Sequence, residues 1–235
     1  MPQLSHTAGQ IISYIEMCQA WSASFQKGMN YRLRPDCSVI LMSRRQNAPY
    51  RDRIEKEGRV LIYEGHDVPR TKSVPDPKSV DQPRLTPGRK LTQNGLFEEA
   101  ALQAKNRVAP PEIVAVYEKI HTGIWAFNGF FLLSDAWLEC DGKRNVFKFR
   151  LELAETDHRT GRDEDFDLEH TRLIPSQVKV DVWKRDKGRC VLCGGRDNLH
   201  FDHDLPFSKG GSSLIAANIR LLCARHNLSK GDKIQ

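Results

Sequence analysis

The sequence predicts an α+β fold in two parts joined by a linker, and three observations carry the prediction. Residues 1–153 contain short apolar runs separated by turn residues, which is the pattern of strands, with few helical stretches. Residues 178–235 hold two pairs of metal-ligating side chains, which is typical of a small domain built around an ion. Residues 154–177 lie between these parts and begin with an acidic stretch that has little to bury, so we expect a linker there.

The elements of the first part follow from periodicity. Apolar residues at helical spacing predict a helix around 8–26, and a second helix is expected at 94–106 with Asn94 as its cap. Apolar runs with turn signals between them predict strands at 38–42, 60–63, 129–133 and 146–151. We expect these strands to form an antiparallel or mixed, barrel-like sheet. No apolar run is long enough to span a membrane, so no membrane partner is expected.

Charge points to a polyanionic partner. The chain has a formal net charge of +6 over 235 residues and an isoelectric point of about 9.0. The acids are concentrated in 154–170, where seven acidic residues face two arginines, whereas 178–235 has eleven Lys and Arg against six Asp. Two basic parts suit nucleic acid, whose phosphates attract cations whatever the base sequence. The acidic segment is interpreted as a solvated linker; the alternative is a shield that covers a basic face until DNA displaces it.

Four side chains in the C-terminal part have the spacing of a zinc site. Two short segments each present two ligands three positions apart, namely Cys190 with Cys193 and Cys223 with His226. Together they close a tetrahedral site with no open position, which predicts a structural Zn²⁺. The alternative is two unrelated pairs of buried thiols.

The other cysteines stand singly and are interpreted as small apolar core residues: Cys18, Cys37 and Cys140. Because no signal peptide is recognised, we expect a reducing, cytoplasmic location.

Between the two ligand pairs lie residues suited to phosphodiester hydrolysis. Such a reaction needs a base that takes a proton from water and a cation that stabilises the departing oxygen. A histidine side chain titrates near neutrality, so His203 can be the base, and the adjacent Asp202 carboxylate is a hard ligand for Mg²⁺ or Mn²⁺. Asn218 and Asn227 follow at fixed intervals. The alternative for His203 is a surface histidine beside an aspartate.

This constellation resembles the HNH (ββα-metal) nuclease motif built around a structural zinc. The resemblance implies His203 as general base, Asp202 with Asn227 as ligands of one catalytic Mg²⁺ or Mn²⁺, and Asn218 as the residue that holds the His203 loop. The family's third histidine is replaced here by Asn227, which keeps an oxygen ligand. His226 adjoins that position, but its spacing from Cys223 assigns it to zinc.

The first part is similar to the SRA (YDG) domain, a reader that flips modified cytosine out of DNA. The similarity rests on the order of five segments over most of 30–153: SVILMS, GRVLIYEG, LTQNGLFEEAALQ, IWAFNGFFLLSDAW and VFKFRLEL. The signature Tyr-Asp-Gly is replaced by Phe127-Asn128-Gly129. The resemblance implies an SRA/PUA-like curved β-barrel with flanking helices.

A reader of a flipped base needs aromatic faces and a hydrogen-bond acceptor for the cytosine amino group. Tyr50 and Tyr63 match the stacking positions of the family, and Asp52 is the preferred acceptor. Strict counting from the glycine at 58 instead places Arg53 or Ile54 at the position of the acid. Glu64 departs from the family's usual hydroxyl residue, so the chemical group that is read stays open. The alternative for both tyrosines is ordinary strand aromatics.

Residues 66–93 are rich in proline and basic residues, and a segment this long inside a domain is usually functional or disordered. In the family the matching loops enter the DNA grooves. The DNA-binding candidates are therefore Arg70, Arg84, Arg89 and Lys90, together with Lys209 near the nuclease motif.

The two resemblances together imply a modification-dependent DNA endonuclease of the type IV restriction kind, acting on double-stranded DNA that carries 5-methylcytosine or a related base. Because one such site cuts one strand, double-strand cleavage predicts a homodimer. Two alternatives stay open: an HNH nuclease of the homing or recombination type whose first domain reads no modification, and a modified-DNA-binding module that has lost catalysis.

Overall fold

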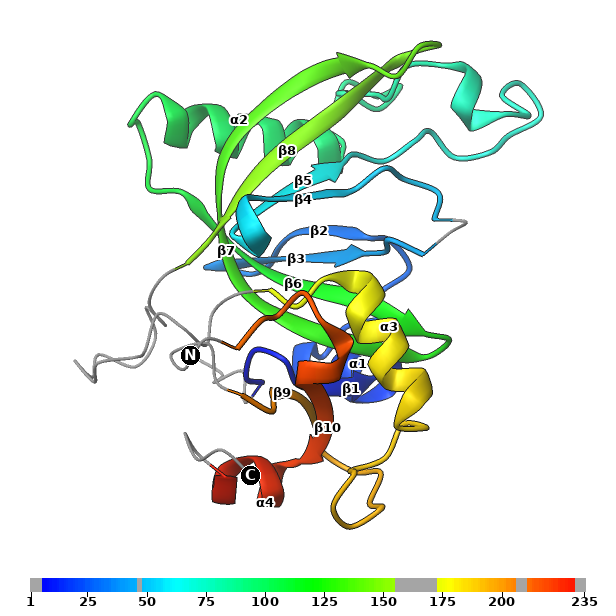
Figure 1. Ribbon diagram of the computed structural model, residues 1–235. Coiled ribbons are helices and arrows are strands. Elements are labelled where there is room, and N and C mark those ends of the chain that lie inside the picture. The colour runs from blue at the N-terminus through cyan, green and yellow to red at the C-terminus, as the bar shows by residue number, and fades with distance from the viewer. Residues whose placement is uncertain (1–5, 46–47, 155–172, 206–210, 231–235) are drawn as a thin grey trace.

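The computed structural model describes residues 6–45, 48–154, 173–205 and 211–230, which form one curved sheet, four helices and a separate hairpin (Figure 1). The helices are α1 (Tyr14–Trp21), α2 (Gln93–Lys105), α3 (Ser176–Arg185) and α4 (Ala224–Lys230). The strands are β1 (Ile11–Ser13), β2 (Met29–Arg34), β3 (Cys37–Met42), β4 (Arg53–Glu55), β5 (Val60–Glu64), β6 (Glu112–His121), β7 (Ile124–Cys140), β8 (Asn145–Leu153), β9 (Leu199–His203) and β10 (Ile219–Cys223).

The large sheet is mixed and strongly curved. Its strand order is β2-β3-β6-β7-β8-β5-β4, with β1 paired to β7. Only the β3–β6 pair is parallel; the other pairs are antiparallel. The predicted α+β fold with a mixed sheet is therefore confirmed. No described backbone pairing joins the two edge strands β2 and β4, so hydrogen bonds do not close the sheet into a full barrel.

The concave side of the sheet encloses the main core. Strands β3 and β5 to β8 contribute alternating apolar side chains, and α2 covers this core with Phe97, Ala100 and Ala101. Rings pack edge to face there, with Phe97 and Phe149 centroids 5.8 Å apart. Long strands such as β6 and β7 bend around the core because register shifts interrupt their pairing, one of them between Val116 and Tyr117.

The first expected helix begins later than predicted. Residues 11–13 form strand β1, and the helix starts at Tyr14, where the Ser13 side chain and Glu16 make a capping box. Ile15, one of the apolar residues at helical spacing that predict this helix, is 67% exposed. The prediction was wrong at this end because the pairing of β1 with β7 outweighs the helical spacing of the apolar residues.

Other local details also differ. Helix α2 is capped by the Thr92 side chain, which accepts from the Gly95 backbone N–H, whereas the expected cap, Asn94, is buried inside the first turn. Of the single cysteines, Cys37 is buried as expected, but Cys18 is half-buried and Cys140 is exposed.

The C-terminal part consists of α3, the β9–β10 hairpin and α4. The hairpin pairs His203 with Ile219 and Asp202 with Arg220. Its apolar core includes Val178, Val182, Phe201 and Leu221, and the same cluster takes in Ile11, Ile120 and Ala126 from the large sheet. The two parts therefore share one continuous apolar contact, and Gln10 also pairs with His200 as an isolated bridge.

A buried polar contact fixes the same interface. The Lys179 ammonium on α3 donates to Glu118 on β6 at 2.7 Å and to the Asn128 side chain on β7 at 2.6 Å. Burial acts to raise the pKa of Glu118, but the Lys179 charge and the hydrogen bonds that Glu118 accepts hold that pKa below its usual value. Helix α3 thus begins at Ser176, within the segment 154–177 that was predicted as the linker, while 155–172 lie outside the described residues.

Among the described helices, none combines the length and the apolar character that a membrane crossing requires.

Candidate functional sites

The predicted grouping of zinc ligands is confirmed. The ligand atoms of Cys190, Cys193, Cys223 and His226 all lie within 4.8 Å of one another. His226 Nδ1 is 3.4 Å from Cys190 Sγ and 3.3 Å from Cys223 Sγ, and Cys193 Sγ is 3.9 Å from Cys223 Sγ. Ligands of a tetrahedral zinc ion, at about 2.0–2.3 Å from the metal, stand roughly 3.5–3.8 Å apart, so these four side chains fit the ion.

The surroundings favour the thiolate form that binds metal. Burial opposes ionisation of Cys190, but hydrogen bonds from the backbone N–H groups of Cys223, Cys193 and Leu192 lower its pKa to about 6. Both ligand pairs sit at chain reversals: the turn after Cys190, and the junction where β10 ends at Cys223 and α4 begins. The hairpin and α4 are therefore held together at the ligands.

Asp202 and His203 are the last two residues of β9, at the end of the hairpin that lies away from Cys223. His203 Nε2 lies 2.8 Å from the Ser213 hydroxyl, which fixes the orientation of the ring. Asn218 lies directly before β10, where its side chain accepts from the Leu205 N–H at 2.8 Å and donates to the Leu205 and Ser212 carbonyls. Asn218 therefore joins the two sides of the loop that follows His203. Lys209 lies in this loop but outside the described residues.

Asp202 pairs with a lysine, Lys230, that was not expected from the sequence. The Lys230 ammonium, at the end of α4, lies 2.5 Å from Asp202 Oδ2 and also donates to the His203 carbonyl oxygen. The Lys230 side chain is 1% exposed, so this cation is part of the interior. The separation of 27 residues between His203 and Lys230 does not predict this contact, because only the packing of α4 on β9 brings the two residues together.

The expected ligands of the catalytic ion, Asp202 and Asn227, lie on different elements, near the end of β9 and on α4. Asn227 lies in the middle of α4 and is half-buried. Asp202 instead pairs with Lys230 in the described part of the chain. Within that part, the zinc cluster is the one group of three or more His, Cys, Asp or Glu side chains arranged for an ion.

In the first part, the three predicted pocket residues converge. Tyr50, Asp52 and Tyr63 line one cavity of about 910 Å³, which extends from β3 and β5 to the ends of β6 and β7 and to α3. The Tyr63 hydroxyl donates to the Leu41 carbonyl at 3.5 Å, so this side chain bridges the two strands. Gly28 keeps the cavity open, because a Cβ at this position would lie 2.7 Å from the Tyr63 hydroxyl.

Asp52 is placed as an acceptor at the cavity wall. Its carboxylate accepts from the Glu64 N–H at 3.1 Å and from the Ser43 N–H at 3.4 Å. Burial raises the pKa of Asp52 to about 7, against these hydrogen bonds, which favour the ionised form. Of the alternatives, Arg53 is exposed and pairs with Glu139, and Ile54 packs against the core, so neither lines the cavity.

His66 also lines this cavity, although its sequence position gave no warning. Its ring stacks on Tyr50 with centroids 5.5 Å apart and planes 19° apart, and its Nε2 lies 3.4 Å from the Tyr63 hydroxyl. Asn94 holds the His66 backbone through both its N–H and its carbonyl. Burial lowers the pKa of His66 to about 4, so the ring is neutral at pH 7.

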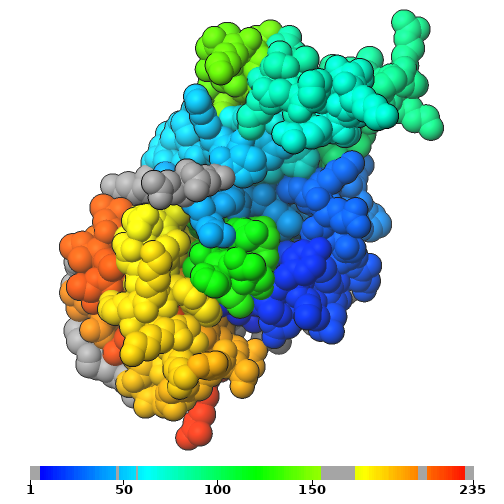
Figure 2. Space-filling view, turned by 90° about the vertical axis from the view of Figure 1, so that its right-hand side faces the viewer, coloured from blue at the N-terminus to red at the C-terminus, as the bar shows by residue number. Residues whose placement is uncertain are grey.

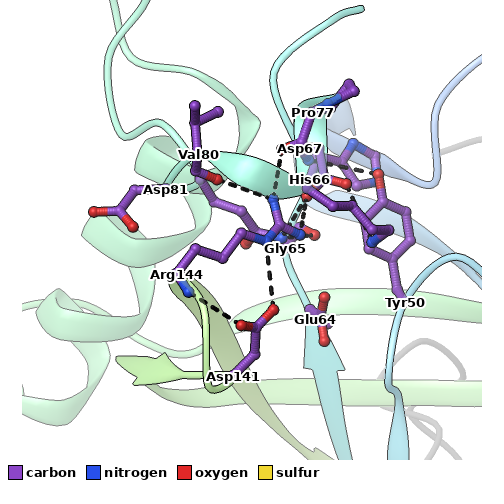
Figure 3. Close-up of polar contacts among 12 residues, drawn as sticks. Tyr50, Glu64, Gly65, His66, Asp67, Pro77, Val80, Asp81, Asp141 and Arg144 are labelled. Carbon is purple, nitrogen blue, oxygen red and sulfur yellow. Dashed lines mark hydrogen bonds and ion pairs between the residues drawn. The ribbon is translucent and has the colours of Figure 1, made fainter. Parts of the chain in front are cut away.

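A buried arginine organises the loop that leads away from His66 (Figure 3). Arg144, whose side chain is 1% exposed, pairs with Asp67 at 2.6 Å and donates to the carbonyl oxygens of Pro77 and Val80. Lys78, in the same loop, lies over the Tyr50 ring at 4.9 Å from its centroid. The loop is therefore fixed against the cavity, and it is not the structureless segment that composition suggested.

The predicted DNA-binding residues of this loop lie on its outside. Arg70, Arg89 and Lys90 are exposed and away from the cavity lining. Arg84 is exposed but pairs with Glu98 of α2 at 2.6 Å. Glu64, the residue that departs from the family pattern, is buried in an ion pair with Lys148 at 2.8 Å and does not line the cavity.

Comparison with known proteins gives similar structures only. No protein-family model matches the sequence, and neither does any curated protein. The SRA domain of SUVH5 in complex with hemimethylated CG DNA is 21% identical, with a TM-score of 0.46 over 65% of this chain and 91% of that chain. The same domain bound to fully hydroxymethylated CG DNA is 19% identical, with a TM-score of 0.46 over 66% and 93%. Arabidopsis thaliana SUVH6 in complex with SAM is 19% identical, with a TM-score of 0.40 over 64% and 26%.

Proposed function

We propose that the chain is a modification-dependent DNA endonuclease whose first part reads 5-methylcytosine or a related base and whose C-terminal part cuts the strand. One observation carries the proposal: aromatic rings and a carboxylate acceptor converge in one cavity, on a chain that also has Asp202 and His203 at the end of a hairpin whose other end carries the Cys and His cluster. The first group suits a flipped base, and the second suits phosphodiester hydrolysis.

The cavity supports base reading through its chemistry. A base that leaves the helix loses stacking worth a few kcal/mol, and aromatic faces can replace it. Tyr50 supplies such a face, whereas the Tyr63 ring is 1% exposed and belongs to the main core, so Tyr63 supports the cavity wall. Asp52 accepts a hydrogen bond from the 4-amino group of cytosine, which thymine lacks. In the absence of DNA, His66 stacks on Tyr50, so an entering base either takes the place of His66 or stacks beyond it.

The cutting step assigns each residue of the hairpin a task. His203 takes a proton from the attacking water, and the Ser213 hydroxyl sets the orientation of its ring. Asn218 holds the loop between His203 and Ser212 in place through the Leu205 backbone. Two copies of the chain are needed to cut both strands of one duplex, because each carries one such site.

A divalent cation would bind at Asp202 and Asn227, whose oxygen atoms suit Mg²⁺ or Mn²⁺. Such an ion stabilises negative charge on the phosphate and on the departing oxygen. The fit is incomplete in the structure, because the Lys230 ammonium already contacts Asp202.

The Lys230 contact also favours a second candidate, a modified-DNA-binding module that does not cut. An ammonium group paired with Asp202 satisfies that carboxylate without a metal. In that case the hairpin would retain its zinc and its fold, and the chain would act through binding alone.

Cleavage of supercoiled plasmid separates these candidates. We expect the full chain with Mg²⁺ or Mn²⁺ to nick plasmid carrying 5-methylcytosine, and His203→Gln to reduce the rate by about 100-fold or more. His200→Gln, on the same strand, is the matched control and should cut normally. If His203→Gln cuts as fast as the parent chain, the catalytic assignment is wrong. If no divalent ion supports cutting although methylated DNA is bound, the binding module is the better account.

A further inference from the structure

The cavity that contains Tyr50 extends beyond the first part of the chain. Its lining continues along the end of β6 and the start of β7 and reaches α3, with Gln177, Val180, Trp183 and Lys184 on the far side. Figure 2 shows α3 (yellow) beside the turn between β6 and β7 (green). The space is therefore a groove with one wall from the large sheet and one wall from the C-terminal part.

The charges along this groove are strongly biased. Five basic side chains line it, namely Lys27, Arg44, Arg45, Lys119 and Lys184. None of the five has an ion pair with a carboxylate in the described ranges, and four of them are exposed. The acids in the lining are Asp52 and Glu118, and Glu118 is neutralised by the buried Lys179. Such a groove attracts a polyanion.

Apolar surface accompanies these cations. Trp125 and Trp183 line the groove, and the Lys119 ammonium lies 5.7 Å from the centre of the Trp125 ring. A groove that combines cations with indole rings suits a nucleic-acid strand, because phosphates contact the cations while sugars and bases contact the rings. A small anion would use only a fraction of this length.

Buried contacts hold α3 in a fixed position against the large sheet, so this helix can form one side of the groove. The buried contact of Lys179 with Glu118 and Asn128 joins the helix to β6 and β7. Val178 and Val182, on the same helix, are buried in the cluster shared by both parts. The exposed Lys184, further along the helix, is therefore held at a fixed place relative to the cavity.

We propose that α3 forms part of the DNA interface of the reader, with Lys184 contacting a backbone phosphate of the same DNA segment that delivers its base to the Tyr50 cavity. This inference rests on the proposed function for the identity of the ligand. It assigns to the C-terminal part a role in binding modified DNA that is separate from cutting.

The test is the salt dependence of binding, measured by fluorescence anisotropy with the full chain in EDTA-free buffer without divalent ions, so that no cleavage occurs. Duplexes of one sequence carry either 5-methylcytosine or cytosine. For Lys184→Ala we expect the affinity for both duplexes to fall on the order of tenfold. We also expect the plot of log K against log salt to become less steep, with the magnitude of its negative slope smaller by about 0.9. Lys187→Ala removes the same charge just beyond α3, outside the groove, and should leave the slope unchanged.

An unchanged affinity and slope for Lys184→Ala would overturn the inference. This result is distinct from failure of the proposed function. If the parent chain binds both duplexes equally well, the proposal that it reads modified cytosine is wrong. The comparison of Lys184→Ala with Lys187→Ala still decides whether α3 contacts DNA. Thermal unfolding of both variants checks that neither has lost its fold.

Discussion

The two candidate sites differ in how the fold holds them. The cavity around Tyr50 lies in a large sheet whose core excludes water from many apolar side chains, and its walls are fixed by backbone hydrogen bonds to Asp52 and by the Asn94 contact with His66. The hairpin around His203 belongs to a small unit that takes part of its core from the large sheet and contains four side chains arranged for an ion. The first site depends on packing, and we expect the second to depend on an ion as well as on its neighbour.

This difference teaches where each site is vulnerable. A small unit buries too little surface to be stable alone, so its stability has to come from metal and from docking. The cavity instead contains a carboxyl group, Asp52, whose burial is unfavourable when it is ionised. It also contains the His66 ring stacked on Tyr50, which a ligand has to accommodate. We therefore expect substitutions to affect the two parts unequally.

The largest expected effect is loss of the zinc ligands. Structural zinc contributes about 10–16 kcal/mol of apparent binding free energy in small domains, so Cys190→Ser or a strong chelator should unfold the C-terminal part and leave the large sheet folded. Thermal unfolding should then split into two transitions, and bound zinc measured on the purified chain should fall. Cys140→Ser, at an exposed cysteine, is the control. A single unchanged transition would show that the cluster does not support the fold.

The second-largest expected effect concerns the buried contact between the two parts. Lys179→Met leaves the Glu118 carboxylate buried without its partner, which costs about 3–5 kcal/mol of unfolding free energy. The double variant Glu118→Gln with Lys179→Met should lose less than Lys179→Met alone, because no buried charge remains. Urea unfolding measures both. Equal losses in the single and double variants would mean that the pair is not coupled.

A smaller effect is expected on DNA binding at the cavity. Asp52→Asn replaces an acceptor that faces the cytosine amino group, and a hydrogen bond to a charged group is worth about 1.5–3 kcal/mol. Because 5-methylcytosine and cytosine share this amino group, we expect equilibrium binding of the methylated duplex to weaken by roughly 10- to 100-fold, in proportion to the energy of that hydrogen bond. Arg53→Gln, next in sequence but outside the cavity, is the control. Unaltered affinity for the methylated duplex in Asp52→Asn would remove Asp52 from the pocket.

The smallest effect concerns pH. The pKa of Asp52 is raised from 3.8 to about 7, so the folded chain holds a proton that the unfolded chain releases at lower pH. The free energy of unfolding should therefore fall as pH rises from about 4 to 7, by at most about 1.4 kcal/mol between pH 5.5 and 6.5. His66 contributes in the opposite direction, but equally in Asp52→Asn, so the difference between the two proteins isolates Asp52. Parallel pH profiles would contradict the burial of an ionisable carboxyl group.

The sequence predicted features that depend on local spacing. Two ligands three positions apart occupy one turn whatever the fold, so the zinc cluster could be predicted from Cys190 to His226. Apolar runs likewise predicted four of the eight described strands of the large sheet, namely β3, β5, β7 and β8. The start of the first helix was wrong because Ile11 and Ile12 fit a helix by spacing but pair with β7 in the fold.

Contacts between distant segments could not be predicted in this way. Lys179 and Glu118 are 61 residues apart, and Lys230 and Asp202 are 28 residues apart. Nothing in the local sequence of a lysine distinguishes an ammonium that is buried against a carboxylate from one in solvent. The stacking of His66 on Tyr50 has the same origin, since it follows from how β5 and the loop after it meet the segment around Tyr50.

The most direct test of the central claim is competition between two duplexes in one reaction. The duplexes have the same sequence, one with 5-methylcytosine and one with cytosine, and carry different fluorescent labels; the full chain is added with Mg²⁺ or Mn²⁺. The account predicts faster cleavage of the methylated duplex by the parent chain, and near-equal, slow cleavage of both by Tyr50→Ala. Equal cleavage of the two duplexes by the parent chain would contradict the claim that the cavity directs the cut.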